Sequence, residues 1–229
     1  MATDPREIPT YTLTDAARYL RISPDTLRRW VKGYEFSTKS GASFSKPLIE
    51  ISGDGFSQLS FYNLVEAHIL SALRRKHNIT MPKVRHALDY LKKKYPSPHP
   101  LADYSFVTDG IHIFIDQFRE LEIIDQHGQL AIRELLEKYL RRVERDERKL
   151  AVRLFPYTSK QEIEDVRLVV IDPRVSFGRP VITGSGVATF IIAERFESGE
   201  SIEELSRDYI MEREEIEEAI RCEYYWKAA

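Results

Sequence analysis

The sequence has little cysteine and no long apolar run, and both absences limit the kind of protein it encodes. Cys222 is the single cysteine among 229 residues, which excludes an internal disulfide and favours the reducing cytoplasm. No apolar run reaches the roughly 18 residues that cross a bilayer, and Met1–Pro9 has no signal-peptide core. We therefore expect a cytoplasmic protein that does not bind membranes.

The usual signatures of enzymes and metalloproteins are also missing. The six histidines are scattered, without the spacing of metal ligands. The glycine-containing stretches lack the Gly-Lys-Ser/Thr ending of a phosphate loop, and no Ser/His/Asp arrangement stands out. We expect a protein without catalytic residues, without a metal and without another cofactor.

What is present is an ordinary globular composition with an uneven distribution of charge. Hydrophobic residues make up 42% and charged residues 31% of the chain, which suits a sizeable core in about one or two domains. The net charge is +7 over residues 1–100, -3 over 101–150 and -6 over 151–229, giving -2 overall. A basic front and an acidic back indicate a polyanionic partner at one end and a different partner at the other.

Patterns along the chain predict three segments, with boundaries near residues 100 and 165. Residues 1–100 are mainly helical, include a charged helix over Met81–Tyr95 and end in Pro96–Pro100, a stretch typical of a linker. Residues 166–229 begin with a buried strand, Val166–Ile171, and end in three short helices.

The middle segment, residues 101–165, is predicted to begin with β-hairpins. Two alternating apolar runs, Ser105–Thr108 and Ile111–Ile115, flank Asp109-Gly110, which is a strong hairpin signal. Leu121–Asp125 and Gln129–Ile132 predict a second hairpin. The following charged helix is expected over residues 131–149, with Leu135, Leu136, Tyr139, Leu140 and Val143 at helical spacing.

Residues 11–32 have the pattern of two short helices joined by a tight turn. Thr12 with Asp15 is a variant of the capping box, and Ser23-Pro24 is a typical helix start. Small residues, Ala16 and Ala17, allow the second helix to cross the first closely. This arrangement is a helix-turn-helix.

The second of these helices has two contrasting faces. Leu27, Trp30 and Val31 are predicted to face inward, and the outer face carries hydroxyl and cationic groups: Thr26, Arg28, Arg29 and Lys32. Arginine can bind guanine O6 and N7 with two hydrogen bonds or pair with phosphate. The pattern therefore predicts a helix that reads double-stranded DNA; the alternative is a helical hairpin whose basic face is merely solvated.

The segments Tyr11–Leu20 and Ser23–Trp30 resemble the start of MerR-type winged helix proteins, and Leu59–Glu66 resembles the entry to that family's third helix. The resemblance implies a β-wing within Tyr34–Phe56, involving Ile49-Glu50-Ile51 and a Gly53-Asp54-Gly55 turn. The candidate DNA-binding residues are Arg18, Arg21, Thr26, Arg28, Arg29, Lys32, Lys39 and Lys46. The long dimerisation helix of MerR regulators is replaced here by the proline-rich stretch and the predicted strands.

The stretch Ile171–Gly186 is similar to the signature of a small domain of unknown biochemical function found in VapB-type antitoxins. Together with the MerR-like start, this makes the whole chain resemble a two-part antitoxin of that group. The resemblance implies a type II toxin–antitoxin pair, in which the chain represses its own operon and neutralises a PIN-type ribonuclease toxin. The alternatives are a MerR-like regulator that senses a small effector through the middle segment, and an adaptor that does not bind nucleic acid.

The last helix, expected over Glu212–Lys227, has an acidic outer face that would repel phosphates. It is interpreted either as solvated glutamates or as a surface for a basic protein partner. The candidate toxin-binding residues are Glu212, Glu214, Glu215, Glu217, Glu218, Tyr224, Tyr225 and Trp226.

The chain is expected to act as a homodimer, because one short recognition helix reads too few bases to find an operator. The expected fold class is mainly α with small β elements (α+β). It comprises an N-terminal winged helix-turn-helix, a middle segment of β-hairpin and helix, and a C-terminal tri-helical module.

Overall fold

The computed structural model describes residues 4–38, 41–51, 58–74, 80–120, 126–158 and 167–224. In chain order its elements are β1 (Tyr11–Thr12), α1 (Leu13–Leu20), α2 (Pro24–Lys32), β2 (Tyr34–Thr38), β3 (Gly41–Ser45), β4 (Gln58–Leu59), α3 (Phe61–Arg74), α4 (Met81–Lys94), the π-helical η1 (Phe106–Gly110), α5 (Ile111–Glu120), α6 (Gln126–Leu140), β5 (Val143–Arg145), β6 (Ala151–Leu154), β7 (Val169–Val170), the 3-10 turn η2 (Ser176–Gly178), β8 (Val181–Ile182), α7 (Thr189–Glu197), α8 (Ile202–Tyr209) and α9 (Arg213–Tyr224).

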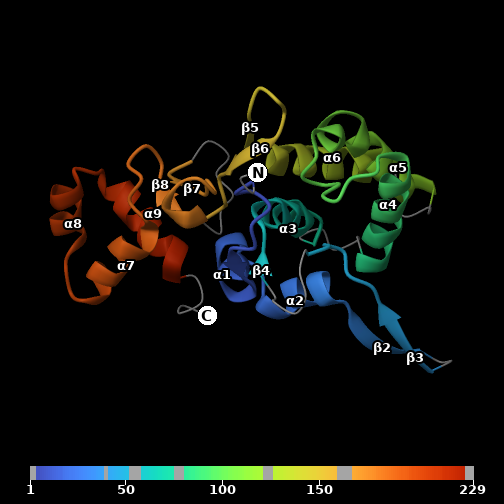
Figure 1. Cartoon of the computed structure of the whole chain (residues 1–229), viewed down its shortest axis with the longest axis horizontal. Helices are drawn as coiled ribbons and strands as arrows, with labels where there is room; N and C mark the ends of the chain where they lie inside the picture. Colours follow the sequence, from blue (N-terminus) through green and yellow to red (C-terminus); the bar gives the residue numbers. More distant parts are fainter. Residues whose placement is uncertain are drawn as a thin grey trace.

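The described residues are mainly helical, and their strands form small antiparallel pairs, β1–β4, β2–β3, β5–β6 and β7–β8. Figure 1 shows α1, α2 and α3 in the middle of the molecule, with α4, α5 and α6 at one end and α7, α8 and α9 at the other. The expected fold class is confirmed, including the helix-turn-helix at the start and the helical C-terminal region.

The helix-turn-helix forms through the predicted local signals. The Thr12 hydroxyl caps α1 by accepting from the Asp15 backbone N–H at 3.1 Å, and it donates to the Asp15 carboxylate at 2.7 Å. Ser23 caps α2 by accepting from the Thr26 N–H at 3.3 Å, with Pro24 at the first helical position. Ala16 and Ala17 are fully buried, so that the two helices can cross closely.

The wing is present, but it is built from residues nearer to α2 than expected. The β2–β3 hairpin pairs Tyr34 with Ser45 and projects from the body in Figure 1. Ile49-Glu50-Ile51 is not a strand; the Ile49 N–H donates to the Trp30 carbonyl at 3.1 Å. The Gly53-Asp54-Gly55 turn lies outside the described residues.

Helix α3 is the centre of the core. All of its residues except Tyr62 and Arg74 are buried, and α1 and α6 pack against it. The buried apolar cluster continues from β1 through α3, α5 and α6 to α9. The proposed division at residue 100 therefore does not coincide with a gap in the core, and residue 165 lies outside the described part of the chain. The three-domain division stays a prediction.

Polar side chains buried on α3 find hydrogen-bond partners in residues 96–100, the segment that was expected to be a linker. The Glu66 carboxylate lies 3.1 Å from His99 Nδ1, and the Glu7 carboxylate lies 3.3 Å from His99 Nε2. His99 and Pro100 are buried, so the linker prediction for Pro96–Pro100 is wrong at its C-terminal end. The imidazole connects the N-terminal segment to the middle of α3.

The hairpin predicted around Asp109-Gly110 is wrong, because residues 106–120 are helical. Phe106, Phe114 and Phe118 are fully buried and meet edge to face, with ring centroids 5.7 and 5.3 Å apart. Their spacing of four or eight residues places them on one side of a helix that packs against α4. The apolar residues of Ile111–Ile115 fit the alternation of a strand as well as the periodicity of a helix. Burial of the three phenylalanines on one side favours the helix.

The second predicted hairpin and the length of the charged helix are also wrong. Gln129–Ile132 belongs to α6, while Leu121–Asp125 lies outside the described residues. Helix α6 ends at Leu140, and the chain turns into the β5–β6 hairpin because the Arg142 side chain is buried. Its Nε donates to the Phe155 carbonyl at 2.8 Å, a contact that a helix continuing to residue 149 would not allow.

The C-terminal region has the predicted three helices, α7, α8 and α9, which follow the short β7–β8 pair in the sequence. The full capping box at the start of α8 is present, with Ser201 and Glu204 bonded reciprocally. The loop between β7 and β8 touches the N-terminal domain at Gly178, whose φ is 76°. A Cβ at this glycine would lie 2.5 Å from Tyr11 Oη, so the close approach of loop and β1 requires glycine.

Gly33→Ala is predicted to loosen the wing. Gly33 has φ 73° and ψ -173°, a region open essentially only to glycine at a cost of about 1–3 kcal/mol for other residues. An added Cβ would also lie 2.3 Å from the Ser45 carbonyl oxygen. Thermal unfolding should show a loss of about 2–4 °C for each kcal/mol at this chain length.

Gly199→Ala is the matched control for the clash, because Gly199 also has a positive φ, 102°, but an added Cβ would meet nothing within 4 Å. An equal loss of stability in the two variants would contradict the steric explanation.

The His99 pKa is predicted to lie above its ordinary value of 6.5. Burial acts to lower this pKa, but the hydrogen bond and charge of Glu66, together with Glu7, outweigh burial and raise it. The stability that the imidazolium contributes is then fully present below pH 6.5 and is lost as pH rises through the folded-state pKa. An NMR titration of the His99 ring protons measures this pKa directly.

Glu66→Gln keeps the shape of the side chain and removes its charge, so the His99 pKa should fall, while Glu137→Gln, a change at an exposed position on α6, should leave it unchanged. A wild-type His99 pKa at or below 6.5 would disprove the assignment.

Candidate nucleic-acid interface

The outer face of α2 presents three exposed cations, Arg28, Arg29 and Lys32. The opposite face is fixed by the buried side chains of Leu27, Trp30 and Val31, as predicted. Trp30 also holds the chain beyond the wing, because its carbonyl accepts from the Leu48 N–H at 2.7 Å. The buried side chains and the hydrogen bond from Leu48 to Trp30 therefore set the orientation of the cationic face.

The polar side chains of this face are held by neighbours within α2 and beyond it. Arg28 forms an ion pair with Asp25, and Thr26 shares a 2.8 Å hydrogen bond with the Ser23 hydroxyl. The Arg29 guanidinium lies 5.3 Å from the ring centroid of Tyr34 on the wing. Stacking on an aromatic ring limits the rotamers of arginine, so Arg29 is partly preorganised.

Two further arginines extend the basic surface beside α2. Arg74 at the end of α3 donates to the Thr26 hydroxyl, and Arg85 on α4 donates to the Lys46 carbonyl. Together with Arg29 they line a shallow cavity of about 170 Å³. The guanidinium groups of Arg74 and Arg85 at this hollow suit a phosphate group, which arginine binds with paired hydrogen bonds.

Arg74 was missed by the sequence reasoning, although the sequence holds a signal for it. The run Arg74-Arg75-Lys76 follows the apolar part of α3, and basic residues at a helix end usually only complement the helix dipole. Its position beside Thr26 depends on how α3 crosses α2, which the spacing within either helix does not reveal.

The wing carries exposed aromatic side chains, Phe36 and Phe44. Lys46, just after β3, is exposed as expected for a residue that could contact the DNA backbone. Lys39 lies outside the described residues.

Arg18 and Arg21 are placed away from the outer face of α2. Arg18 pairs with Asp15 at 2.9 Å and with Glu223 on α9 at 2.8 Å. Arg21 is the left-handed C-cap residue of α1, and its positive charge acts to lower the pKa of the Glu218 carboxyl. Both cations interact with glutamates of the C-terminal helix. They therefore do not belong to the basic surface formed by Arg28 and Arg29.

The acidic face of α9 differs from the expectation in one important respect. Glu218 is buried, with 4% of its surface exposed, and pairs with Arg221. Burial raises the pKa of its carboxyl in spite of the nearby arginines. Placing Glu218 on the outer face was wrong, because α9 turns this side toward α1 and Arg21.

The other glutamates predicted to bind the toxin are closer to solvent. Glu212 and Glu214 are exposed, and Glu215 accepts from the Glu212 N–H at 2.8 Å, which caps the helix. Glu217 pairs with Arg213 at 2.7 Å, so the face is only partly acidic. The Tyr224 hydroxyl donates to the Ala193 carbonyl at 3.0 Å and helps to close the α7–α9 contact. Tyr225 and Trp226 lie outside the described residues.

Within the described residues, no group of three or more His, Cys, Asp or Glu side chains is arranged to hold a metal ion. No helix in that part of the chain is both long and apolar enough to span a membrane. Cys222 on α9 is buried, and burial raises the pKa of its thiol far above the ordinary value. A thiol in these surroundings suits a packing role and not that of a nucleophile.

Comparisons with known proteins agree with this arrangement. Residues 9–88 match a family described as "Putative DNA-binding HTH domain", and residues 169–224 match a family described as "Protein of unknown function (DUF433)". The first match covers the helix-turn-helix, the wing and α3, and the second covers the β7–β8 pair and the three C-terminal helices.

Relatives along nearly the whole chain come from Mycobacterium tuberculosis. "Putative antitoxin VapB45" is 29% identical over 232 residues, which cover 93% of each chain. "Uncharacterized protein Rv2308" is 23% identical, over 94% of this chain and 89% of its own length. The crystal structure of Rv2018 aligns with a TM-score of 0.66 at 25% identity, covering 96% of this chain and 100% of the other. The chain thus combines a region that matches the family described as "Putative DNA-binding HTH domain" with a region that matches the DUF433 family, and a distant full-length homologue is named "Putative antitoxin VapB45".

Proposed function

We propose that this chain is the antitoxin of a type II toxin–antitoxin pair. In this proposal it binds operator DNA through α2 and the wing, represses its own operon, and neutralises a PIN-type ribonuclease through its C-terminal module. The observation that carries the DNA-binding part is the outer face of α2, where Arg28, Arg29 and Lys32 are exposed on a helix fixed from behind by buried Leu27 and Trp30.

The surroundings of α2 support binding to a phosphate backbone. Arg74 and Arg85 add two cations beside Arg29 at the shallow cavity, and exposed Lys46 follows the wing. Contacts of this kind position a protein on the duplex, whereas side chains in the major groove select the sequence. We assign sequence reading to Arg28, Arg29 and Lys32, and phosphate contact to Arg74, Arg85 and Lys46.

The proposed DNA-binding unit is a homodimer. One α2 helix spans only a few base pairs, and a two-fold pair would read half-sites about 34 Å apart or a multiple of that distance. Sedimentation of the full chain with and without its promoter fragment tests this, and a monomer under both conditions at micromolar concentration would exclude it.

The proposed toxin-binding surface lies on the C-terminal module. A ribonuclease must present cations to its RNA, because phosphate neutralisation dominates such affinity. The exposed carboxylates of Glu212 and Glu214 suit that cationic groove, and charge complementarity would speed the encounter. Occlusion of the RNA site inhibits the toxin without chemistry by this chain.

Arg28→Ala and Arg29→Ala are each predicted to weaken binding to the chain's own promoter by about 1–3 kcal/mol if they contact bases, and to relax specificity at the base contacted. Fluorescence anisotropy with the promoter fragment and with a scrambled duplex measures both effects. The control is Arg207→Ala, which removes an exposed arginine on α8 and should leave promoter affinity unchanged. Undiminished promoter binding by the Arg28→Ala/Arg29→Ala double variant would rule out this interface.

Glu212→Lys combined with Glu214→Lys is predicted to impair neutralisation of the proposed ribonuclease toxin, because the reversed charges would repel its RNA groove. Growth rescue on co-expression is the measurement. Glu134→Lys with Glu137→Lys, at exposed positions of α6, makes the same charge change elsewhere and should still rescue. Equal rescue by the two double variants would remove the electrostatic part of the assignment.

These point substitutions are preferable to removal of the C-terminal module. Arg18 on α1 pairs with Glu223 on α9, and Gly178 packs against Tyr11. A truncated chain would lose these contacts and expose the core of the DNA-binding domain, so its failure would not separate toxin binding from folding.

A further inference from the structure

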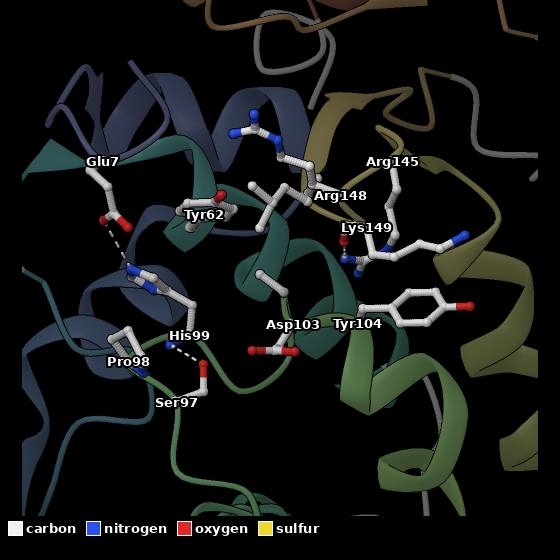
Figure 2. Close-up of a pocket in the computed structure, with 13 residues that line it drawn as sticks. Glu7, Tyr62, Ser97, Pro98, His99, Asp103, Tyr104, Arg145, Arg148 and Lys149 are labelled. Carbon is white, nitrogen blue, oxygen red and sulfur yellow. Dashed lines mark hydrogen bonds and ion pairs between the residues drawn. The ribbon is translucent and has the colours of Figure 1, made fainter. Parts of the chain in front are cut away.

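A cavity of about 240 Å³ lies where four separate parts of the chain meet. One wall comes from the N-terminal segment and the start of α3, through Glu7 and Tyr62. A second comes from residues 97–104, and the third from the turn between β5 and β6. Figure 2 shows these side chains around the hollow, with His99 and Tyr62 on one side, Arg145, Lys149 and Tyr104 on the other, and Arg148 above them.

The lining carries more positive than negative side chains. Arg145, Arg148 and Lys149 contribute three cations from one wall. The two lining carboxylates have contacts of their own: Glu7 pairs with His99, and Asp103 accepts from the backbone N–H and the hydroxyl of Ser105, both at 3.0 Å. The electrostatic character of the hollow therefore favours an anion.

Two aromatic rings provide flat apolar surface in the same cavity. The Tyr62 ring stacks on His99, with centroids 5.3 Å apart and planes 26° from parallel. The Tyr104 ring lies 5.8 Å from the Arg145 guanidinium carbon and 5.3 Å from the Lys149 amine. Pockets for small molecules commonly combine such apolar surface with a few polar groups that fix orientation.

Arg145 has an unmet hydrogen-bonding requirement at this site. Its Nη1 donates to the Lys149 carbonyl at 3.0 Å, but its buried Nη2 has no acceptor among the described residues. Burial of a guanidinium N–H without an acceptor is costly, and such groups in native proteins call for a partner. A ligand oxygen reaching this wall would supply the acceptor after a small shift of the side chain.

We propose that this cavity binds a small organic anion, a carboxylate or phosphate carried on a flat ring. The anionic group would meet Arg145, Arg148 and Lys149, and the ring would lie against Tyr62 and Tyr104. The volume is slightly below the roughly 300–1,000 Å³ of pockets for drug-sized molecules, which excludes a folded peptide or a dinucleotide as occupant.

A ligand at this place would contact both the DNA-binding domain and the middle segment. Glu7 and Tyr62 lie next to β1 and at the start of α3, whereas the cations lie on the β5–β6 turn. The residues next to Glu7 and Arg145 in the sequence already join the two sides, because Arg6 pairs with Asp146 at 3.5 Å. Occupancy would add a further connection between them. Binding of the ligand would require neither DNA nor toxin.

Isothermal titration of the full chain with phenyl phosphate, benzoate, inorganic phosphate and benzyl alcohol tests the proposal. Saturable binding of phenyl phosphate or benzoate is expected, and which of them binds more tightly distinguishes phosphate from carboxylate. Benzyl alcohol, which has the ring without the charge, should not bind. The absence of saturable binding by either aromatic anion at about 1 mM would overturn the proposal.

Two variants locate the site. Arg148→Gln changes an exposed side chain, so the protein should fold, and it should weaken binding about tenfold through loss of one charged contact. Arg207→Gln on α8 is the matched control and should bind as the wild type does. Equal weakening in the two variants would show that the anion binds through diffuse charge, which contradicts a site in this cavity.

Tyr104→Leu tests the contribution of the ring. It should weaken phenyl phosphate and leave inorganic phosphate unchanged, with circular dichroism as the check on folding. If inorganic phosphate binds as tightly as phenyl phosphate and Tyr104→Leu changes neither, the aromatic part of the proposal fails.

Discussion

The burial of α3 on nearly all sides is the constraint on which the rest of the structure depends. A helix surrounded by protein must satisfy its polar side chains internally, and α3 carries Asn63, Glu66 and His68 in its buried part. Glu66 is met by His99, and the His68 ring lies 3.1 Å from the Tyr139 carbonyl on α6. The segment after α4 and the end of α6 are thus held in place by groups on α3, which sets where the middle segment can pack.

The uneven charge along the sequence is partly neutralised inside the molecule. Arg18 from the basic front pairs with Glu223 from the acidic back, and the charge of Arg21 acts on the buried Glu218 carboxyl. The charge distribution along the sequence suggested external partners for both ends. Part of that charge instead joins α1 to α9 within the molecule. What stays at the surface is more local: cations around α2, and exposed carboxylates at the start of α9.

The parts of the fold that the sequence predicts well are those set by neighbours along the chain. Helix caps, the proline at the start of α2 and the apolar stripe containing Trp30 require only a few adjacent residues, and each is confirmed. The strands predicted at Ser105–Thr108 and Ile111–Ile115 failed because alternation and helical periodicity fit the same short run, and packing against α4 selects the helix. Arg74 and Glu218 were missed or misplaced for a similar reason: their surroundings come from helices distant in sequence.

The pairing of Arg18 with Glu223 also bears on the order in which a growing chain can complete its fold. The two residues lie near opposite ends of the sequence, and contacts of such high separation form late because the intervening loop must be closed first. On the ribosome the helix-turn-helix emerges long before α9, so α1 lacks this carboxylate until α9 has emerged. The helix-turn-helix therefore acquires its final contacts only after α9 has also been synthesised.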